Sequence, residues 1–285
     1  MTEMKIIRID DADYPAHLRS IKDPPLRLYY RGDLSLISAP AVAIVGTRRC
    51  SPYGRWAARE IAKRVAGCGV PVVSGMAAGI DSAAHWGCLE SGMGTVAVFG
   101  TGLDVCFPAS NKQLYAKIAA CGLMLSEYEP GTEGFAGNFP QRNRIISGLA
   151  KSVVVVEGAI KSGSMITARL ALEQGRDVFA VPGNINQPNS IGVNKLIADG
   201  ACPIMELDTI PEMLGIGHGR VRRMIDRLTD EEKIIIGNVL EAPGITAEEI
   251  SLRSGMELRT AVLLTSSLEL KGLVFTEGRR IYMAK

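Results

Sequence analysis

The sequence lacks the residue patterns that hold a metal ion or a disulfide framework. Its three histidines, His17, His85 and His218, are too few and too scattered for a histidine-rich metal site. Its six cysteines lie far apart and form no CxxC pair. We therefore predict no metal site, and we interpret the cysteines as reduced, mostly buried thiols of a cytoplasmic protein.

Long apolar runs are also missing. No stretch approaches the roughly 20 apolar residues of a membrane span, and the N-terminal segment MTEMKIIRIDD is acidic and polar, unlike a signal peptide. With 47% hydrophobic and 22% charged residues, the chain can still build a substantial soluble core. These features predict a cytoplasmic protein that does not contact a membrane.

Neither an excess of one charge nor a standard nucleotide motif is present. The formal net charge is +2, so any contact with nucleic acid must rest on a local cationic patch. Neither GxGxxG nor GxxxxGK[ST] occurs in the 285 residues. Gly100-Thr101-Gly102 lacks the third glycine, and no helix start follows it at once. The usual dinucleotide and P-loop sites are therefore disfavoured.

Residues 41–210 alternate between β-rich and helical segments. We expect strands at 41–46, 71–74, 95–99, 123–127, 152–157 and 177–181, and helices at 55–66, 80–89, 111–120, 142–150, 164–174 and 191–199. This alternation predicts a Rossmann-like, doubly wound parallel α/β sheet. Ligands of such sheets bind beyond the carboxyl ends of the strands, where most of the expected loops here contain glycine.

The segments on either side of this region have a different character. Residues 1–40 are too few for a core of their own, and we expect them to form a strap packed on the domain at 41–210. Residues 211–224 combine three glycines with a basic run and are interpreted as a linker. Residues 225–285 are expected to form a small C-terminal domain.

The C-terminal domain shows a winged-helix pattern. Three helices are expected at 229–241, 246–254 and 257–270, followed by a hairpin around Glu277-Gly278. Thr229 with Glu232, and Thr246 with Glu249, fit capping boxes. The third helix carries only one cation, Arg259, and two glutamates, which favours a protein contact or a packing role over reading of a DNA duplex.

Two expected strand ends carry residues suited to an anion. Arg48 follows the first strand, and the hydroxyl of Thr47 beside it either donates to a ligand or caps the next helix. Lys161-Ser162-Gly163-Ser164 opens a helix, whose free amides and dipole favour an anion. Thr167 lies one turn further, on the face of Ser164. The structural alternatives are a surface salt bridge for Arg48 and a solvated Lys161 beside an ordinary helix.

The segment that precedes residues 152–157 is also cationic. Arg142 and Arg144 are two positions apart, so on a helix they point about 200° apart and cannot both face one small ligand. We assign Arg142 to the ligand and Arg144 to a contact within the protein. Phe139, just before this helix, has two open interpretations: a hydrophobic staple or a stacking platform for a base.

Two pairs of titratable residues are candidates for acid–base chemistry. Asp81 and His85 would share a helix face, but we favour Asp81 as a helix N-cap and His85 as a hydrogen-bonded structural residue. Glu127 and Glu129 lie on one side of a strand end. Because no nucleophile or metal ligand accompanies them at a recognisable spacing, we favour structural, loop-ordering roles for both.

Taken together, these loops resemble the DNA-processing protein A (DprA/Smf) family. The resemblance rests on several long motifs: YPAHLRSIKDPPLRLYYRG at 14–32, GTRRCSPYG at 46–54, SGMAAGIDSAAH at 74–85, VFGTGLDVCFPASNKQLY at 98–115, SEYEPG at 126–131, FPQRNRIISGLAKSVVVVEGAIKSGSMITARLALEQGRDVFAVPGNI at 139–185 and GVNKLIADGA at 192–201. Only thirteen residues precede Tyr14. We therefore expect the helix-hairpin-helix or SAM-like domain that often precedes this core in the family to be absent here or trimmed away.

The resemblance implies an extended Rossmann fold that binds single-stranded DNA without a cofactor and without catalysis. Members of the family protect incoming strands in natural transformation, help to load the RecA recombinase and act as homodimers. The winged helix is variable among them. The DNA-binding residues that the resemblance implies are Gly46, Thr47, Arg48, Ser74, Gly75, Phe139, Arg142, Lys161, Ser162, Gly163 and Ser164.

The alternative is an enzyme of the related lysine-decarboxylase-like (LOG) type, a phosphoribohydrolase that releases the base from nucleoside monophosphates. Its PGGxGTxxE signature is missing. The comparable loop of this chain reads Pro182-Gly183-Asn184-Ile185-Asn186. This difference argues against hydrolysis.

Overall fold

The chain divides into two compact units, residues 1–217 and 218–285. The computed structural model describes residues 3–216 and 228–283. Part of the predicted linker, residues 217–224, and residues 225–227 of the predicted C-terminal domain lie outside the described residues. None of the described helices combines the length and the apolarity needed to cross a membrane.

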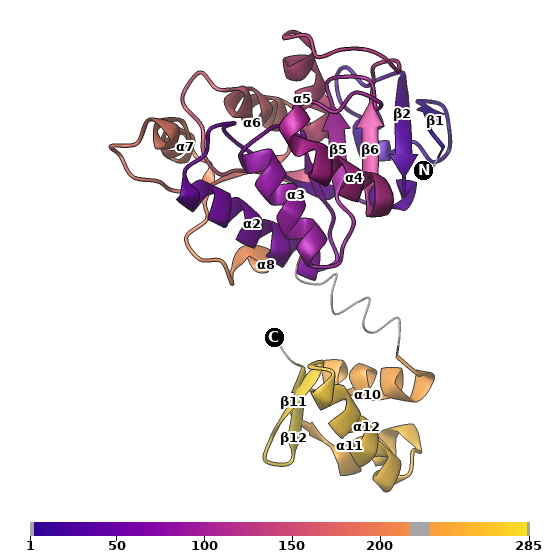
Figure 1. The fold of residues 1–285 in the computed structure, drawn as a ribbon. Coiled ribbons are helices and arrows are strands. Elements are labelled where there is room, and N and C mark those ends of the chain that lie inside the picture. Colours follow the sequence, from indigo (N-terminus) through magenta and orange to yellow (C-terminus); the bar gives the residue numbers. More distant parts are fainter. Residues whose placement is uncertain (1–2, 217–227, 284–285) are drawn as a thin grey trace. The chain divides into compact units, whose positions relative to one another are not determined.

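The first unit is built on a nine-stranded sheet with the order β1-β2-β6-β5-β4-β3-β7-β8-β9. Figure 1 shows β5, β6, β2 and β1 side by side at one end of this sheet. Neighbouring strands from β6 to β9 pair in parallel, whereas β1 and β2 pair antiparallel at one edge. The strands are β1 Lys5–Arg8, β2 Arg27–Gly32, β3 Ala41–Val45, β4 Val72–Ser74, β5 Val96–Phe99, β6 Leu123–Ser126, β7 Ala150–Val155, β8 Asp177–Ala180 and β9 Cys202–Pro203. The predicted parallel sheet is confirmed.

The direction in which strands are added reverses next to β3. From β3 the chain adds β4, β5 and β6 on one side, and then returns to add β7, β8 and β9 on the other side. The crossovers that leave β3 and β7 therefore diverge, and this opens a crevice beyond the carboxyl ends of these two strands. A doubly wound sheet binds its ligands at this position.

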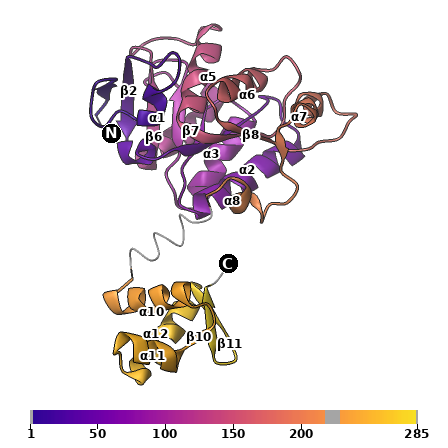
Figure 2. The same cartoon turned by 180° about the vertical axis from the view of Figure 1, so that it is seen from behind.

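Helices cover both faces of the sheet (Figure 2). Along β3, Ala41, Ala43 and Val45 face one apolar cluster, and Val42 and Ile44 face another, because side chains alternate along a strand. The first face is covered by α1 Ala16–Arg19, α5 Asn138–Gly148, α6 Gly163–Glu173 and α7 Pro188–Ala198. The other face is covered by α2 Pro52–Gly67, α3 Ile80–Glu90, α4 Lys112–Cys121 and α8 Ile210–Met213. Two short 3₁₀ helices, η1 Leu34–Ile37 and η2 Ala109–Asn111, complete the described elements of this unit.

Three sequence-based expectations need correction. The N-terminal segment does not merely pack on the core, because β1 and β2 extend the sheet beyond β6. The linker cannot begin at residue 211, because Leu214 and Ile216 are buried in the same cluster as α2. The cysteines are not mostly buried: Cys68 and Cys88 are, whereas Cys121 and Cys202 are exposed.

The described residues of the second unit form three helices and a small antiparallel sheet of order β10-β12-β11. Its described elements are α10 Asp230–Glu241, β10 Ile245–Thr246, α11 Ala247–Ser254, α12 Leu258–Leu270, β11 Val274–Glu277 and β12 Arg280–Met283. Both predicted capping boxes are present, with Thr229 and Thr246 accepting hydrogen bonds from the backbone amides of Glu232 and Glu249. The element order agrees with the expected three helices and hairpin, and the winged-helix assignment stays a prediction.

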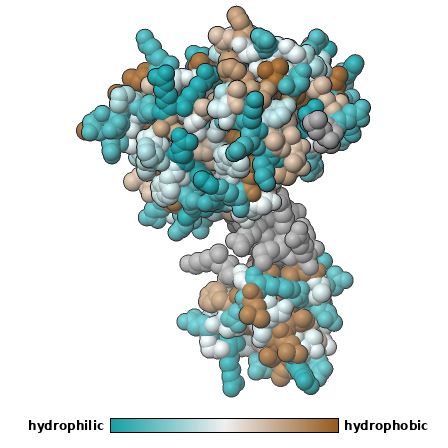
Figure 3. Space-filling view, in the orientation of Figure 1, coloured by the Kyte–Doolittle hydropathy of each residue, from teal (hydrophilic) through white to brown (hydrophobic). Residues whose placement is uncertain are grey.

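Helix α12, the third helix of this unit, presents apolar side chains to solvent. Leu263 is 62% exposed and Leu270 92% exposed, and Leu258 and Val262 are also exposed. Figure 3 shows apolar side chains on the surface of this unit. The scarcity of cations on α12 is thus accompanied by an apolar surface, which is unlike that of a helix that enters a DNA groove.

Candidate functional site

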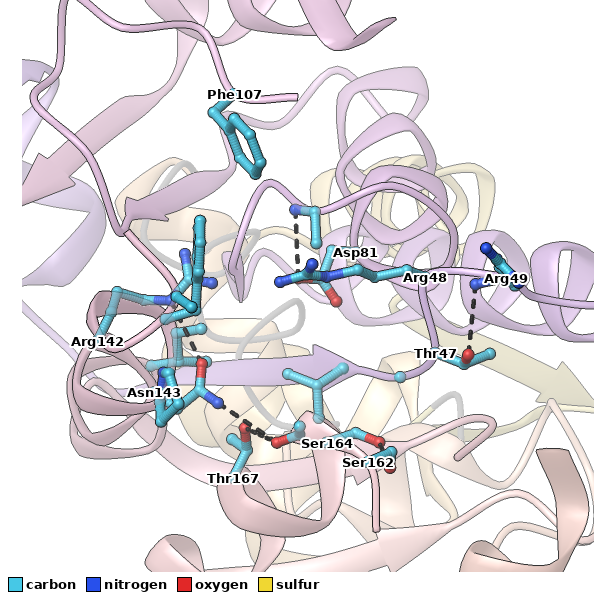
Figure 4. A pocket seen from close by; sticks show the side chains of 18 of the residues that line it. Thr47, Arg48, Arg49, Asp81, Phe107, Arg142, Asn143, Ser162, Ser164 and Thr167 are labelled. Carbon is cyan, nitrogen blue, oxygen red and sulfur yellow. Dashed lines mark hydrogen bonds between the residues drawn. The ribbon is translucent and has the colours of Figure 1, made fainter. Parts of the chain in front are cut away.

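A pocket of about 800 Å³ opens beyond the carboxyl ends of β3 and β7, at the crevice that the strand order predicts (Figure 4). Its walls come from the loops after β3 and β4, from the segments before α4 and α5, and from the beginnings of α5, α6 and α7. The lining residues are Val45, Gly46, Thr47, Arg48, Arg49, Ala77, Asp81, Phe107, Gly134, Ala136, Phe139, Pro140, Arg142, Asn143, Ile146, Ser162, Gly163, Ser164, Thr167 and Asn189.

The loop after β3 is held in place from beneath by Glu157. The Thr47 amide donates to the Glu157 carbonyl at 2.8 Å, and the Ser51 amide donates to the buried Glu157 carboxylate at 2.9 Å. Ser51, and not Thr47, caps α2, because its hydroxyl accepts from the Gly54 amide at 3.0 Å. The loop is therefore fixed at both ends. Its exposed residues Arg48 and Arg49 line the pocket.

One wall of the pocket combines two aromatic rings with a cation. The Arg48 guanidinium carbon lies 5.1 Å from the centre of the Phe139 ring. The Phe107 and Phe139 ring centres are 5.3 Å apart at an angle of 32°. Phe107 is 42% exposed, so part of the wall remains open to a ligand. A positive charge held over an aromatic face suits a ligand that carries both phosphates and flat rings.

Arg142 lies at the base of the pocket and is 4% exposed. Its guanidinium donates to the carbonyls of Gly75, at 2.7 Å, and Val98. The Asp81 carboxylate accepts from the amides of Gly75, at 3.2 Å, and Ala77, at 3.4 Å. Burial lowers the pKa of Arg142 to about 10, although Asp81 partly offsets this effect. Arg142 and Asp81 thus hold the loop after β4 from both sides.

A side chain at position 75 would press on both Arg142 and Asp81. A Cβ atom at Gly75 would lie 2.6 Å from Nη2 of Arg142 and 2.8 Å from a carboxylate oxygen of Asp81. The next residue, Met76, is buried with a φ of 59°, a left-handed conformation that costs a non-glycine residue of the order of 1 kcal/mol. The hydrogen bonds of Arg142 and Asp81 hold the loop in this conformation.

The expectation that Asp81 caps a helix was wrong. Gly79 is the N-cap of α3, and the Asp81 side chain instead binds the amides of the preceding loop. His85 is fully buried and its Nδ1 lies 2.8 Å from the Thr95 hydroxyl, as expected for a structural histidine. Burial lowers the pKa of His85 to about 3, which keeps the ring neutral. The pair therefore offers no exposed acid or base.

The first turn of α6 forms the opposite wall. Ser162 is the N-cap, but its hydroxyl makes no capping hydrogen bond and lies 2.8 Å from the Ser164 hydroxyl. The first-turn amides and the positive end of the helix dipole consequently face the pocket. Asn143 supports this turn by donating to the Gly163 carbonyl at 3.3 Å. The turn is suited to a phosphate.

The remaining predicted residues lie around this pocket or beneath it. Gly75 lines a smaller adjoining cavity of about 110 Å³. Ser74 is buried, and its hydroxyl donates to the Ile44 carbonyl at 2.6 Å. Lys161 is exposed next to Ser162 and does not line either cavity. The structure therefore brings most of the predicted residues together, with Ser74 inside the sheet and Lys161 outside the rim.

Arg144, Glu127 and Glu129, which were expected to have structural roles, form ion pairs within the protein. Arg144 donates to Glu127 at 2.8 Å and to Asp23 at 2.9 Å. Glu129 forms an ion pair with Arg27 at 2.7 Å. The two glutamates thus order the loop after β6 and bind arginines, in agreement with the loop-ordering role.

Sequence reasoning missed several parts of the site. Arg49 stands beside Arg48 and could have been recognised from that neighbour. Phe107 lies in a loop with no periodic pattern. Asn189 is brought to the site by contacts distant in the sequence: its side chain donates to the Arg49 carbonyl at 2.8 Å, and its carbonyl accepts from the Gly158 amide at 2.7 Å. In the described parts of the chain, no group of three or more His, Cys, Asp and Glu side chains could hold a metal ion.

The fold and the site define a doubly wound α/β protein with an open pocket in which cations, helix amides and aromatic rings converge. The chain belongs to the DNA recombination-mediator protein A family, whose model matches residues 5–215. This membership confirms the resemblance seen in the sequence motifs. The match covers the first unit and ends before the second.

Named relatives and solved structures agree with this assignment. The chain is 47% identical to DNA processing protein DprA of Streptococcus pneumoniae over 195 residues, which cover 68% of each protein. It is 43% identical to DprA of Bacillus subtilis over 209 residues, covering 73% of this chain and 70% of that protein. The crystal structure of the S. pneumoniae protein superposes with a TM-score of 0.71 over 74% of each chain, at 42% identity.

A second solved structure comes from another member of the family. DNA processing protein A from Helicobacter pylori superposes with a TM-score of 0.68 and 34% identity, covering 75% of this chain and 97% of that one. That structure concerns the mode in which the H. pylori protein binds single-stranded DNA.

Proposed function

We propose that this protein binds single-stranded DNA without regard to sequence, protects incoming strands and delivers them to the RecA recombinase during natural transformation. The observation that carries this proposal is the convergence of Arg48, the rings of Phe107 and Phe139, and the first turn of α6 on one open pocket. The single-stranded DNA binding mode of the H. pylori relative supports it.

The residues predicted for the site divide into those that contact DNA and those that position the loops around it. Arg48 and Lys161 neutralise phosphates, and the amides and hydroxyls of the loops after β3 and β7 position them. Phe139 is a platform for a base. Ser74 and Arg142 act as positioning residues, since both bind backbone carbonyls. The residues proposed for the DNA site are Gly46, Thr47, Arg48, Ser74, Gly75, Phe139, Arg142, Lys161, Ser162, Gly163 and Ser164.

Binding, and not catalysis, is the proposed activity. The one carboxylate on the pocket lining, Asp81, is 6% exposed and accepts two amide hydrogen bonds, so it is poorly placed to activate water. Incubation with a panel of nucleoside monophosphates is expected to release no free base. Release of a base would favour the phosphoribohydrolase alternative.

The affinity for single strands is expected to depend on salt. Arg48, Arg49 and Lys161 are exposed at the pocket or its rim. Each phosphate neutralised on a single strand contributes about −0.7 to the slope of log K against log salt. Three such contacts therefore predict a slope of about −2. Fluorescence anisotropy of a labelled oligothymidylate across a salt series measures the slope. A flat dependence, or tighter binding to duplex, would contradict the proposal.

Reversal of the charge of Lys161 is expected to weaken binding without unfolding the protein. Lys161 is exposed, so Lys161→Glu removes no buried contact. A hydrogen bond to a charged group is worth about 1.5–3 kcal/mol, which corresponds to a loss of affinity of at least about tenfold. The matched control is Lys151→Glu, an exposed lysine near the amino end of β7. Equal effects of the two variants would show that only overall charge matters.

We further propose that the protein acts in the cytoplasm as a homodimer and contacts RecA. A dimer would engage two stretches of one strand and gain affinity through effective concentration. The apolar surface of α12 suits a protein contact of the second unit better than a duplex contact. A gel shift with single- and double-stranded DNA, with and without RecA, tests ligand preference and delivery together.

A further inference from the structure

Beyond the pocket, the first two turns of α2 carry two exposed aromatic side chains. Tyr53 is 49% exposed and Trp56 is 52% exposed. Their ring centres lie 6.1 Å apart at an angle of 34°, so the rings lie next to each other on one face of the helix. Neither residue lines the pocket, and both remain unexplained by the proposed function.

This aromatic pair is joined to the pocket wall by short links. Trp56, Tyr53 and the pocket residue Arg49 lie within eight positions of one another along the chain. The Tyr53 hydroxyl donates to the Pro182 carbonyl at 3.4 Å, in the loop that precedes α7, and Asn189 of α7 donates to the Arg49 carbonyl. Two hydrogen bonds thus connect the segment that carries the aromatic pair to the segment around the start of α7. In Figure 4, Arg49 lies across the pocket from Arg142 and Asn143, at the edge from which the chain enters α2.

The start of α2 is rigid, so the rings are presented in a fixed direction. Gly54 packs on the Glu157 carboxylate so closely that a Cβ atom there would lie 2.3 Å from Cδ of Glu157. Ser51 caps the helix and binds the same carboxylate. The buried side of the first turn is therefore anchored, and its outer side bears the two rings.

The surface around the rings is cationic. Residues 46–59 contain four arginines and no acidic residue, although the whole chain has a net charge of only +2. Arg59 forms an ion pair with Glu90. Arg48, Arg49 and Arg55 form no ion pair with any residue in the described parts of the chain. Aromatic rings among unpaired arginines are the combination by which proteins hold a single strand without reading its sequence.

We propose that Tyr53 and Trp56 form a second stacking platform, on which the single strand continues after it leaves the pocket past Arg49. The bases stack on the two rings, and Arg49 and Arg55 neutralise the phosphates between them. This inference rests on the proposed function and extends its site along α2. The platform predicts that affinity increases with strand length beyond what the pocket alone can hold.

Tryptophan fluorescence of the full chain tests the platform directly. The protein has two tryptophans, Trp56 and the partly buried Trp86, so Trp86→Phe leaves Trp56 as the single reporter. Oligothymidylates of about four to sixteen nucleotides span the site sizes of single-strand-binding domains. The shortest oligomers are expected to bind without quenching Trp56, and longer ones to quench it as they bind more tightly.

A variant pair separates stacking from other roles of this face. Trp56→Ala is expected to weaken binding of the longer oligomers about tenfold, because stacking of one base on an aromatic ring is commonly worth about 1–3 kcal/mol, which is roughly fivefold or more in affinity. It should leave the shortest oligomers unaffected, and Trp56→Phe, which keeps a ring, should retain most of the affinity. Arg55→Ala is expected to reduce the salt slope for long oligomers, whereas Arg169→Ala, on the outside of α6, should not.

The outcomes distinguish this inference from the function on which it rests. If short and long oligomers bind equally well and Trp56→Ala changes neither, the platform is refuted and the pocket stands. If Trp56→Ala changes the oligomeric state and not the affinity for DNA, this face is a contact between subunits, and the platform is also refuted. If no oligomer binds to the unaltered protein, the proposed function fails, and the platform fails with it.

Discussion

Replacement of Arg48 by alanine is expected to weaken the binding of single-stranded DNA about 100-fold and to leave the fold intact. The guanidinium is exposed, borders both cavities and lies over the Phe139 ring. Its removal takes away a charged hydrogen-bond donor to phosphate, worth about 1.5–3 kcal/mol. The upper part of this range corresponds to about two orders of magnitude in affinity.

Two further variants separate the charge of Arg48 from its shape. Arg48→Lys keeps the charge but loses the planar fork, and it should recover only part of the affinity. Arg169→Ala removes another exposed arginine, which pairs with Glu173 one turn along α6, and it should leave binding unchanged. Anisotropy titrations of all three variants, together with their urea unfolding curves, give the measurement. If Arg48→Ala bound as tightly as the unaltered protein, the aromatic wall would not be the DNA site.

The sequence was most informative where local chemistry determines structure. The β-branched runs and the periodic helices predicted the parallel strands, and the capping boxes at Thr229 and Thr246 were found as expected. Strand ends that combine arginine, lysine, serine and glycine predicted the pocket, because the carboxyl ends of neighbouring parallel strands meet at one edge of a sheet. Arg48 and Ser162 lie about 114 residues apart and still line the same cavity.

Other features that depend on contacts distant in the sequence were not predicted. The antiparallel pairing of β2 with β6 joins segments separated by about 90 residues, and no local pattern specifies it. The support of the β3 loop by Glu157 depends on a contact across 106 positions. Burial is likewise a tertiary property, so the sequence could not distinguish an arginine exposed to a ligand from one that braces a loop.

Arg142 shows this difficulty most clearly. Its place near a helix start suggested a direct contact with DNA, but its guanidinium is 4% exposed and is bound to the carbonyls of Gly75 and Val98. The nearby Asp81 carboxylate accepts hydrogen bonds from two backbone amides of the same loop. The charges offset one another in a site from which water is largely excluded, where loss of one partner leaves the other buried and uncompensated.

Replacement of Arg142 by methionine is therefore expected to act first on stability. It leaves the Asp81 carboxylate without its cation and two carbonyls without donors. Such a loss is expected to lower the free energy of unfolding by about 3–5 kcal/mol, because it removes a buried charged donor from two carbonyls and a nearby positive charge from the buried Asp81 carboxyl. Because Arg142 also holds the loop that carries Gly75, DNA affinity should fall in parallel. Urea unfolding followed by circular dichroism measures the first effect.

Two matched variants complete the test of Arg142. Arg144→Met, two positions along the same helix, removes an arginine whose partners Glu127 and Asp23 are partly or largely exposed, so it should cost only about 1 kcal/mol. The double variant Asp81→Asn/Arg142→Met removes both charges, and its loss should be smaller than the sum of the two single losses, because the two residues share one set of loop contacts. A small loss of stability in Arg142→Met, together with a large loss of DNA affinity, would instead assign this arginine to the phosphates directly.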